Sequence, residues 1–195
     1  MEAITGIEIL AVFLALAYLV LAAYQSLLCW LAAAISSLLY IKICFDANLF
    51  IETGLQFFYL IMAIVGYFQW RKQTLQSESE TGIINLTLKE GIIGIVICSL
   101  ISIIMAIWFQ QNTQAKLPWL DAPVTIFSIW ATWLVIKKVL QNWLLWIVID
   151  AIAIYIYFQR NLNLTAFLYL LYTLLAIIGY FKWKKVQTAS SKLLL

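Results

Sequence analysis

Seven long apolar runs follow one another along the chain, and this pattern restricts the fold more than any other feature of the sequence. They cover residues 7–24, 29–45, 49–70, 91–109, 123–136, 142–158 and 164–183. A helix needs about 20 apolar residues to cross a bilayer, and it satisfies its own backbone polar groups in lipid. With 65% hydrophobic and only 11% charged residues, the chain is predicted to be an all-α membrane protein with seven transmembrane helices.

Several functional classes are disfavoured by what the chain lacks. No separate soluble domain fits into 195 residues, and the net charge of +3 is too small to indicate nucleic-acid binding. The sequence contains no histidine, which removes the commonest metal ligand and acid/base group. Cys29, Cys44 and Cys98 stand singly inside apolar runs, without the paired spacing of a redox or zinc site. We therefore expect neither an enzyme nor a bound metal or cofactor.

Polar segments and basic residues predict the connections and the orientation. Residues 73–81 are predicted to form an exposed loop, residues 46–48 a turn, and residues 110–113 with Pro118 and Pro123 the loop before the fifth helix. Bases gather on one side of the predicted membrane, which should be cytoplasmic. The amino terminus is then outside and the carboxyl terminus inside. The inner bases are Arg71, Lys72, Lys89, Lys137, Lys138, Lys182, Lys184, Lys185 and Lys192, against Lys42, Lys116 and Arg160 outside.

An internal repeat divides the chain into corresponding halves. Residues 63–72 (AIVGYFQWRK) and 176–185 (AIIGYFKWKK) share seven identities in ten positions, and the same offset of 113 residues continues without gaps over three runs. Further matches at this offset are Trp30 with Trp143, Asn48 with Asn161, Leu49 with Leu162, and Tyr59 with Tyr172. We predict two parallel three-helix repeats, residues 1–72 and 113–195, separated by a polar loop and linker helix at residues 73–112. Such repeats are typical of transporters with a site near the middle of the membrane.

A carboxylate and two tryptophans interrupt the sixth apolar run. Trp143, Trp146 and Asp150 follow one another at steps of three and four residues, which places them on one face of a helix. Asp150 would lie near the middle of the bilayer, where a charge is costly and usually functional. Two alternatives stay open: Trp143 could belong to the aromatic belt at the membrane interface, and Asp150 could pair with a neighbouring helix or relay protons.

Departures from the repeat predict an asymmetric binding site. Asp150 and Trp146 align with small residues and Gln56 with a tyrosine, the partners being Ser37, Ala33 and Tyr169. A carboxylate beside tryptophan rings suits an organic cation, because ring faces attract positive charge by about 0.5–2 kcal/mol. Polar groups would add selectivity, although Gln56 could instead hold helices together. The predicted substrate-binding residues are Gln56, Tyr59, Asn142, Trp143, Trp146, Asp150, Tyr169 and Tyr172. Glu52 and Asp121 are expected to be solvated near the outer surface, where either could attract a cation.

Three segments resemble the PnuC family of vitamin transporters. They are residues 141–146 (QNWLLW), residues 56–70 ending in Gly66-Tyr67-Phe68-Gln69-Trp70, and Trp119-Leu120-Asp121. The resemblance covers nearly the whole chain, and Asn-Trp-x-x-Trp is its most specific part. It implies a 3+1+3, SWEET-like bundle in the inner membrane, and facilitated uptake of nicotinamide riboside followed by phosphorylation by a separate cytoplasmic kinase. Asn142, Trp143 and Trp146 match its motif, and Gln56 lies at its third-helix polar position.

The sequence leaves several alternatives open. Relatives in the same family resemble thiamine or riboflavin carriers, and thiamine is also a cationic aromatic molecule. A proton-coupled transporter with Asp150 as the relay is the second alternative. The short termini predict no fused kinase or regulatory domain. Membrane lipid is an expected partner, and the oligomeric state, including a homo-oligomer, is not readable from the chain.

Overall fold

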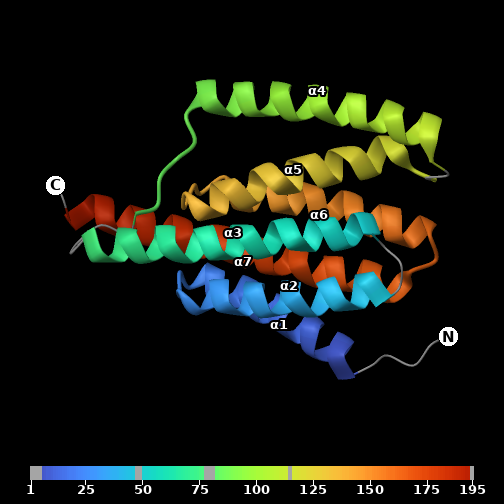
Figure 1. Cartoon of the computed structure of the whole chain (residues 1–195). Coiled ribbons are helices and arrows are strands. Elements are labelled where there is room, and N and C mark those ends of the chain that lie inside the picture. The colour runs from blue at the N-terminus through green and yellow to red at the C-terminus, as the bar shows by residue number, and fades with distance from the viewer. Residues whose placement is uncertain (1–5, 47–49, 77–81, 114–115, 194–195) are drawn as a thin grey trace. The chain divides into compact units, whose positions relative to one another are not determined.

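The computed structural model describes residues 6–46, 50–76, 82–113 and 116–193, and these form seven helices with their connections (Figure 1). Six of the helices are long and apolar enough to cross a membrane. The seventh, α3, contains Gln56, Gln69 and two bases, and it is not in this set. The predicted all-helical membrane architecture is therefore confirmed, with six apolar span candidates in the described residues. The helices are α1 (Gly6–Ala23), α2 (Leu28–Asp46), α3 (Phe50–Gln76), α4 (Leu88–Asn112), α5 (Pro118–Ile136), α6 (Asn142–Gln159) and α7 (Asn163–Leu193).

Two predicted loops are partly helical. The fifth helix begins at Pro118 instead of Pro123, since a proline in the first turn lacks only an N–H that has no partner within the helix. Pro123 lies inside α5 and removes one backbone hydrogen bond there. Helix α3 continues to Gln76, because no glycine or proline follows Trp70 before that point. Residues 77–81 of the predicted loop, and residues 47–48 of the predicted turn, lie outside the described residues.

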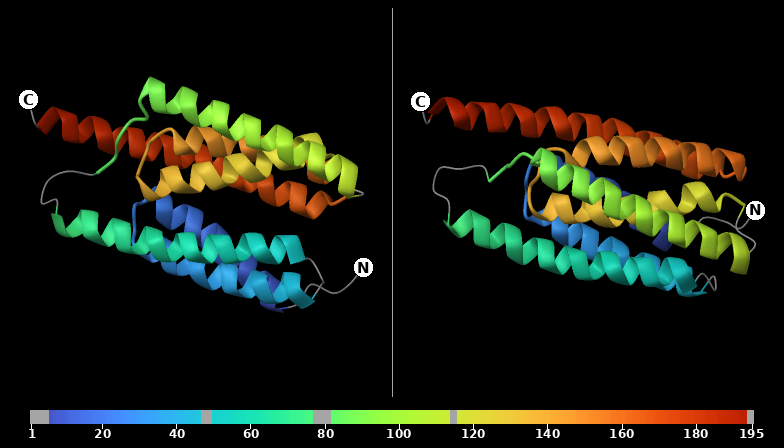
Figure 2. Two further views of the ribbon diagram at one scale, coloured as in Figure 1. Left: turned by 45° about the horizontal axis from the view of Figure 1, so that its top comes forward. Right: turned by 90° about the horizontal axis from the view of Figure 1, so that it is seen from above.

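The helices belong to two compact units, which are described separately. The first unit contains α1, α2 and α3 together with Thr188–Leu195, and the second spans Ile83–Gln187. In the first unit α2 packs against both α1 and α3, and in the second α5 packs against both α4 and α6 (Figure 2). Large apolar side chains of α4, such as Ile97 and Ile104, are about half exposed or more. Such an apolar outer surface is expected of a protein solvated by lipid.

The turns after α1 and after α5 have the same backbone conformation at an offset of 113 residues. Gln25 and Lys138 both have a positive φ, of 55° and 53°. In each turn the N–H of the following residue donates to the carbonyl five residues back: Ser26 to Leu21 at 3.0 Å and Val139 to Leu134 at 2.9 Å. This is the Schellman arrangement, which ends a helix by satisfying its last carbonyls. Each turn directs the chain into the next helix of its unit.

The same offset relates two tryptophan pairs that join the second and third helices of a bundle. Trp30 and Trp70 meet edge to face at 5.2 Å between ring centroids in the first unit, and Trp143 and Trp183 do so at 5.4 Å in the second. A glycine lies under the first ring of each pair: Gly66 under Trp30 and Gly179 under Trp143. Only glycine allows this approach, because an added Cβ would lie 2.5–2.8 Å from ring atoms. All four indoles are buried.

A short extended segment ties the start of α4 to the turn between α5 and α6. Ile84 forms an isolated parallel bridge with Val139, through hydrogen bonds from Ile84 N–H to Lys138 O and from Leu140 N–H to Ile84 O. Thr87 then caps α4, with a reciprocal capping box to Glu90. Sequence analysis did not predict this segment. Its effect is to fix the amino-terminal end of α4 within the second unit.

Candidate functional site

Asp150 is the central feature of α6. The residue is only 3% exposed, and within the described part of the chain no hydrogen bond or ion pair reaches its carboxylate. A buried carboxylate without a partner is costly, and inside a membrane span such a group usually serves a function. Trp146, one turn earlier, is half-buried and lies on the same side of the helix because four residues complete about one turn. The two side chains therefore present an aromatic ring and an acid along one face of α6.

Asn142 begins α6 and is fully buried, with 0% exposure. Its amide Nδ2 donates to the carbonyl of Val139 at 2.6 Å, while its Oδ1 is buried and has no partner among the described residues. The neighbouring Gln141 uses both ends of its side chain on the segment before α4. Its Oε1 accepts from Leu86 N–H at 2.8 Å and its Nε2 donates to Asn85 at 3.2 Å. The polar start of α6 thus fixes the turn, and one amide oxygen is left for a further donor.

Trp143 lies inside the helix packing of the second unit. Its ring is 1% exposed, covers Gly179 and meets Trp183 edge to face. Its Nε1 is buried without a partner, as is that of Trp30 at the corresponding position of the first unit. Because both halves contain the same arrangement, these contacts favour a structural role for Trp143 over substrate binding. Its predicted contact with a substrate stays a prediction.

The tyrosines of α7 meet a residue that sequence analysis missed. Tyr169 stacks on Tyr157 of α6, with centroids 5.1 Å apart and ring planes 16° from parallel, and meets Tyr172 edge to face at 5.5 Å. The predicted residues Tyr169 and Tyr172 are therefore brought together with each other and with Tyr157. A signal for Tyr157 was present, because it follows Asp150 by seven residues and so lies on the same helix face.

The two predicted residues of α3, Gln56 and Tyr59, are both half-buried in the first unit. They are three residues apart and therefore lie on neighbouring positions of one side of the helix. Tyr59 also contacts the ring of Phe58 edge to face at 5.7 Å between centroids. This places an amide and a phenol on one side of α3.

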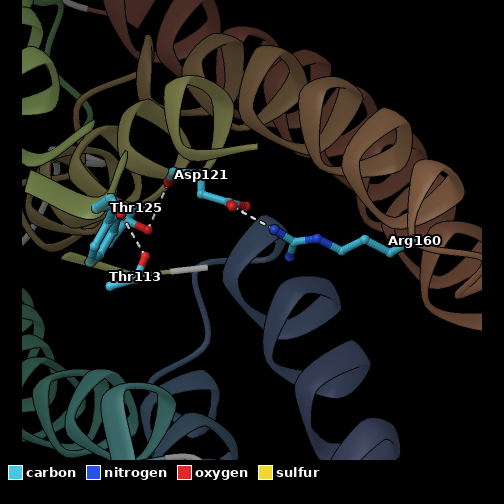
Figure 3. A network of polar contacts seen from close by, with 5 residues as sticks. Thr113, Asp121, Thr125 and Arg160 are labelled. Carbon is cyan, nitrogen blue, oxygen red and sulfur yellow. Dashed lines mark hydrogen bonds and ion pairs between the residues drawn. The ribbon is translucent and has the colours of Figure 1, made fainter. Parts of the chain in front are cut away.

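Asp121 is not the solvated carboxylate that sequence analysis expected. It accepts from the guanidinium of Arg160 at 2.5 Å, and the two side chains are only 23% and 29% exposed (Figure 3). Thr125 in turn donates to the backbone carbonyl of Asp121 at 2.9 Å. The prediction was wrong because Arg160, at the end of α6, is distant in sequence but adjacent in the fold. The side chain of Glu52 lies outside the described residues.

Comparison with known proteins decides the family. The family model described as "Nicotinamide mononucleotide transporter" matches residues 5–185. The chain belongs to this family. The predicted membership of a PnuC-type family is thereby confirmed. It is a family of transporters and not of enzymes, and with six apolar span candidates the chain is a multi-pass membrane protein.

The chain is similar to several characterised members of the nicotinamide mononucleotide transporter family. The nicotinamide riboside transporter PnuC of Escherichia coli is 25% identical over 165 residues, which cover 72% of this chain and 69% of the relative. The PnuC of Neisseria mucosa is 27% identical over 169 residues, or 80% of this chain and 64% of that protein. The crystal structure of the vitamin B3 transporter PnuC superposes with a TM-score of 0.73 at 23% identity, covering 93% of this chain and 81% of that one. This last similarity shows the fold.

Proposed function

We propose that the chain is a carrier that takes up nicotinamide riboside, a pyridinium cation attached to a ribose. The observation that carries the proposal is Asp150, a buried carboxylate with no partner in the described residues, in a member of a family whose relatives are named nicotinamide riboside transporters. A cationic ring would offset the cost of burying this charge. Trp146 on the same face offers a π surface to the same cation.

The electrostatics of α5 and α6 favour the riboside over the mononucleotide. A mononucleotide adds a phosphate with about two negative charges, which proteins recognise with arginine or lysine. Neither α5 nor α6 contains a lysine or arginine. Asp150 would repel a phosphate placed near it, and this repulsion is strong at low dielectric. A neutral ribose needs only hydrogen bonds, which amides and hydroxyls supply.

The proposed architecture is two parallel three-helix repeats, residues 1–72 and 113–195, joined through residues 73–112 by the linker helix α4. It is supported by the Schellman turns at Gln25 and Lys138 and by the paired tryptophans, all at an offset of 113 residues. Parallel repeats in transporters enclose a site near the membrane midplane and alternate its access by moving one repeat against the other. We propose this mechanism, with a substrate site built from both repeats.

Orientation and direction complete the proposal. The bases near residues 71–72, 137–138 and 182–185 place those helix ends in the cytoplasm of a cell whose inner membrane holds the protein. The amino terminus is then outside and the carboxyl terminus inside. Transport is passive, and a separate cytoplasmic kinase traps the riboside by adding a charged phosphate.

Uptake into liposomes tests this function. The purified protein is reconstituted, and entry of radiolabelled nicotinamide riboside is followed without an ion gradient and then with an imposed proton gradient. We expect saturable uptake in both conditions, with nicotinamide mononucleotide a poor competitor. Uptake that requires the proton gradient would replace the passive carrier by a proton-coupled one. Absence of riboside uptake under either condition would refute the proposal.

A thermal-shift panel separates the vitamin substrates. Bound ligand stabilises the folded state in proportion to the logarithm of its concentration over Kd. Nicotinamide riboside, thiamine and riboflavin are added to the protein in detergent at equal concentration. We expect the largest rise of the unfolding midpoint with nicotinamide riboside. A larger rise with thiamine would assign the carrier to the other cationic aromatic vitamin.

A further inference from the structure

Three tyrosines form one continuous aromatic cluster in the second unit. Tyr157 of α6 and Tyr169 of α7 stack nearly parallel, and Tyr172 places its ring edge to face against Tyr169. All three are half-buried. Their rings therefore combine a fixed orientation with an accessible surface.

The cluster continues the face of α6 that holds the buried carboxylate. Trp146, Asp150 and Tyr157 are separated by four and seven residues, and at 100° per residue they lie within about 40° of one another around the helix. Tyr157 is about 10 Å further along the axis than Asp150, towards the end of α6 at Gln159. In the orientation proposed above this is the outer end.

The repeat does not account for the cluster. The positions that correspond to Tyr157, Tyr169 and Tyr172 in the first half are Cys44, Gln56 and Tyr59. Only one of the three tyrosines is therefore matched, whereas the tryptophan pairs and the turns recur in both halves. A feature required for helix packing alone would be expected in both halves, as the tryptophan pairs are.

We propose that Tyr157, Tyr169 and Tyr172 form an aromatic subsite for the cationic ring of the substrate, on the outer side of Asp150, and that Tyr157 is a specificity-determining residue. The inference rests on the proposed function, because it requires a substrate that carries a positive charge. The ring faces of the cluster attract a cation and exclude its hydration shell. The substrate then passes from one site of negative potential to the next, so the positive charge is stabilised before it reaches the carboxylate.

The test compares Tyr157→Leu with Tyr155→Leu by isothermal titration calorimetry on the purified protein. Tyr155 lies about 180° away from Trp146 around α6 and is 52% exposed, so its replacement controls for the loss of a tyrosine from the same helix. Each variant is titrated with nicotinamide riboside and with benzamide riboside, the uncharged isostere in which carbon replaces the ring nitrogen. We expect Tyr157→Leu to weaken riboside binding about five- to thirtyfold and benzamide riboside binding about threefold or less. Tyr155→Leu should change neither affinity by more than about twofold.

The outcomes separate this inference from the proposed function. If the unmodified protein binds no nicotinamide riboside, the proposed function fails and the subsite fails with it. If the unmodified protein binds and Tyr157→Leu behaves like Tyr155→Leu, or weakens both ligands equally, the subsite is refuted while the carrier function stands.

A second variant keeps the test decisive should Tyr157→Leu not fold. Pentafluorophenylalanine at position 157 keeps the shape of the ring and stacks well on a phenol, but its quadrupole is inverted. It should weaken binding of the riboside selectively. An unchanged affinity for nicotinamide riboside would overturn the proposal.

Discussion

Replacing Gly179 by alanine tests the packing of the second unit with a single added carbon. An ideal Cβ at this position would lie 2.7 Å from Cη2 and Cζ3 of Trp143, whereas carbon atoms in good contact are about 3.5–4.0 Å apart. The indole must move by about 1 Å, although it and Trp183 beside it are buried. Overpacking of this kind lowers the free energy of unfolding by about 1–3 kcal/mol. The thermal midpoint in detergent should fall by roughly 2–10 °C.

Two other glycines provide matched controls for this measurement. Gly66→Ala should lower the midpoint by a similar amount, because its Cβ would lie 2.5 Å from the ring of Trp30. Gly54→Ala should leave the midpoint unchanged or raise it, since nothing lies within 4 Å of its Cβ and alanine is favoured over glycine in a helix by about 0.5–1 kcal/mol. If Gly179→Ala melts at or above the unmodified protein, as expected for Gly54→Ala, the packing argument is wrong.

Polar contacts of the second unit give two further predictions. Asp121→Asn should lower the free energy of unfolding by about 1 kcal/mol, because it breaks a partly buried ion pair with Arg160; Lys42→Ala, which breaks a largely exposed pair, should cost under about 0.5 kcal/mol, and equal losses would contradict the assignment. Gln141→Leu removes the acceptor of the Leu86 N–H, so amide hydrogen exchange of residues 83–87 should accelerate about tenfold. Unchanged exchange there would show that the segment before α4 is held by other contacts.

Local patterns predicted the helices and the correspondence between the halves. A run of apolar residues determines a membrane helix by its own length and composition, so the all-helical class followed directly from the sequence. The match between residues 63–72 and 176–185 indicated that Trp70 and Trp183 are equivalent. It did not show that each packs against a tryptophan of the preceding helix, over a glycine.

Contacts between distant residues could not be predicted in this way. Arg160 pairs with Asp121 across 39 residues, and Gln141 binds Leu86 across 55. Both partners of each pair were visible in the sequence, but nothing local specifies which polar groups meet. Boundaries at prolines failed for a related reason, since Pro123 can lie within a helix when the surrounding residues accommodate it.

The candidate site was predictable only where helical periodicity applied. Trp146 and Asp150 were singled out because their spacing places them on one face and their chemistry is unusual in a membrane span. Tyr157 extends that face, but a tyrosine near a helix end is common at membrane interfaces and was not singled out. Its importance appears only with the stacked ring of Tyr169.

The affinity of Asp150→Asn for a charged and an uncharged ligand tests the central claim, that this carboxylate receives the positive charge of the substrate. Titration calorimetry measures the Kd of nicotinamide riboside and of benzamide riboside for the unmodified protein and the variant, which differ by one charge at constant shape. The account predicts that Asp150→Asn weakens nicotinamide riboside at least about tenfold, since removing one partner of a buried charge pair costs about 2–5 kcal/mol, and weakens benzamide riboside by less than about threefold. Equal losses for the two ligands would contradict it.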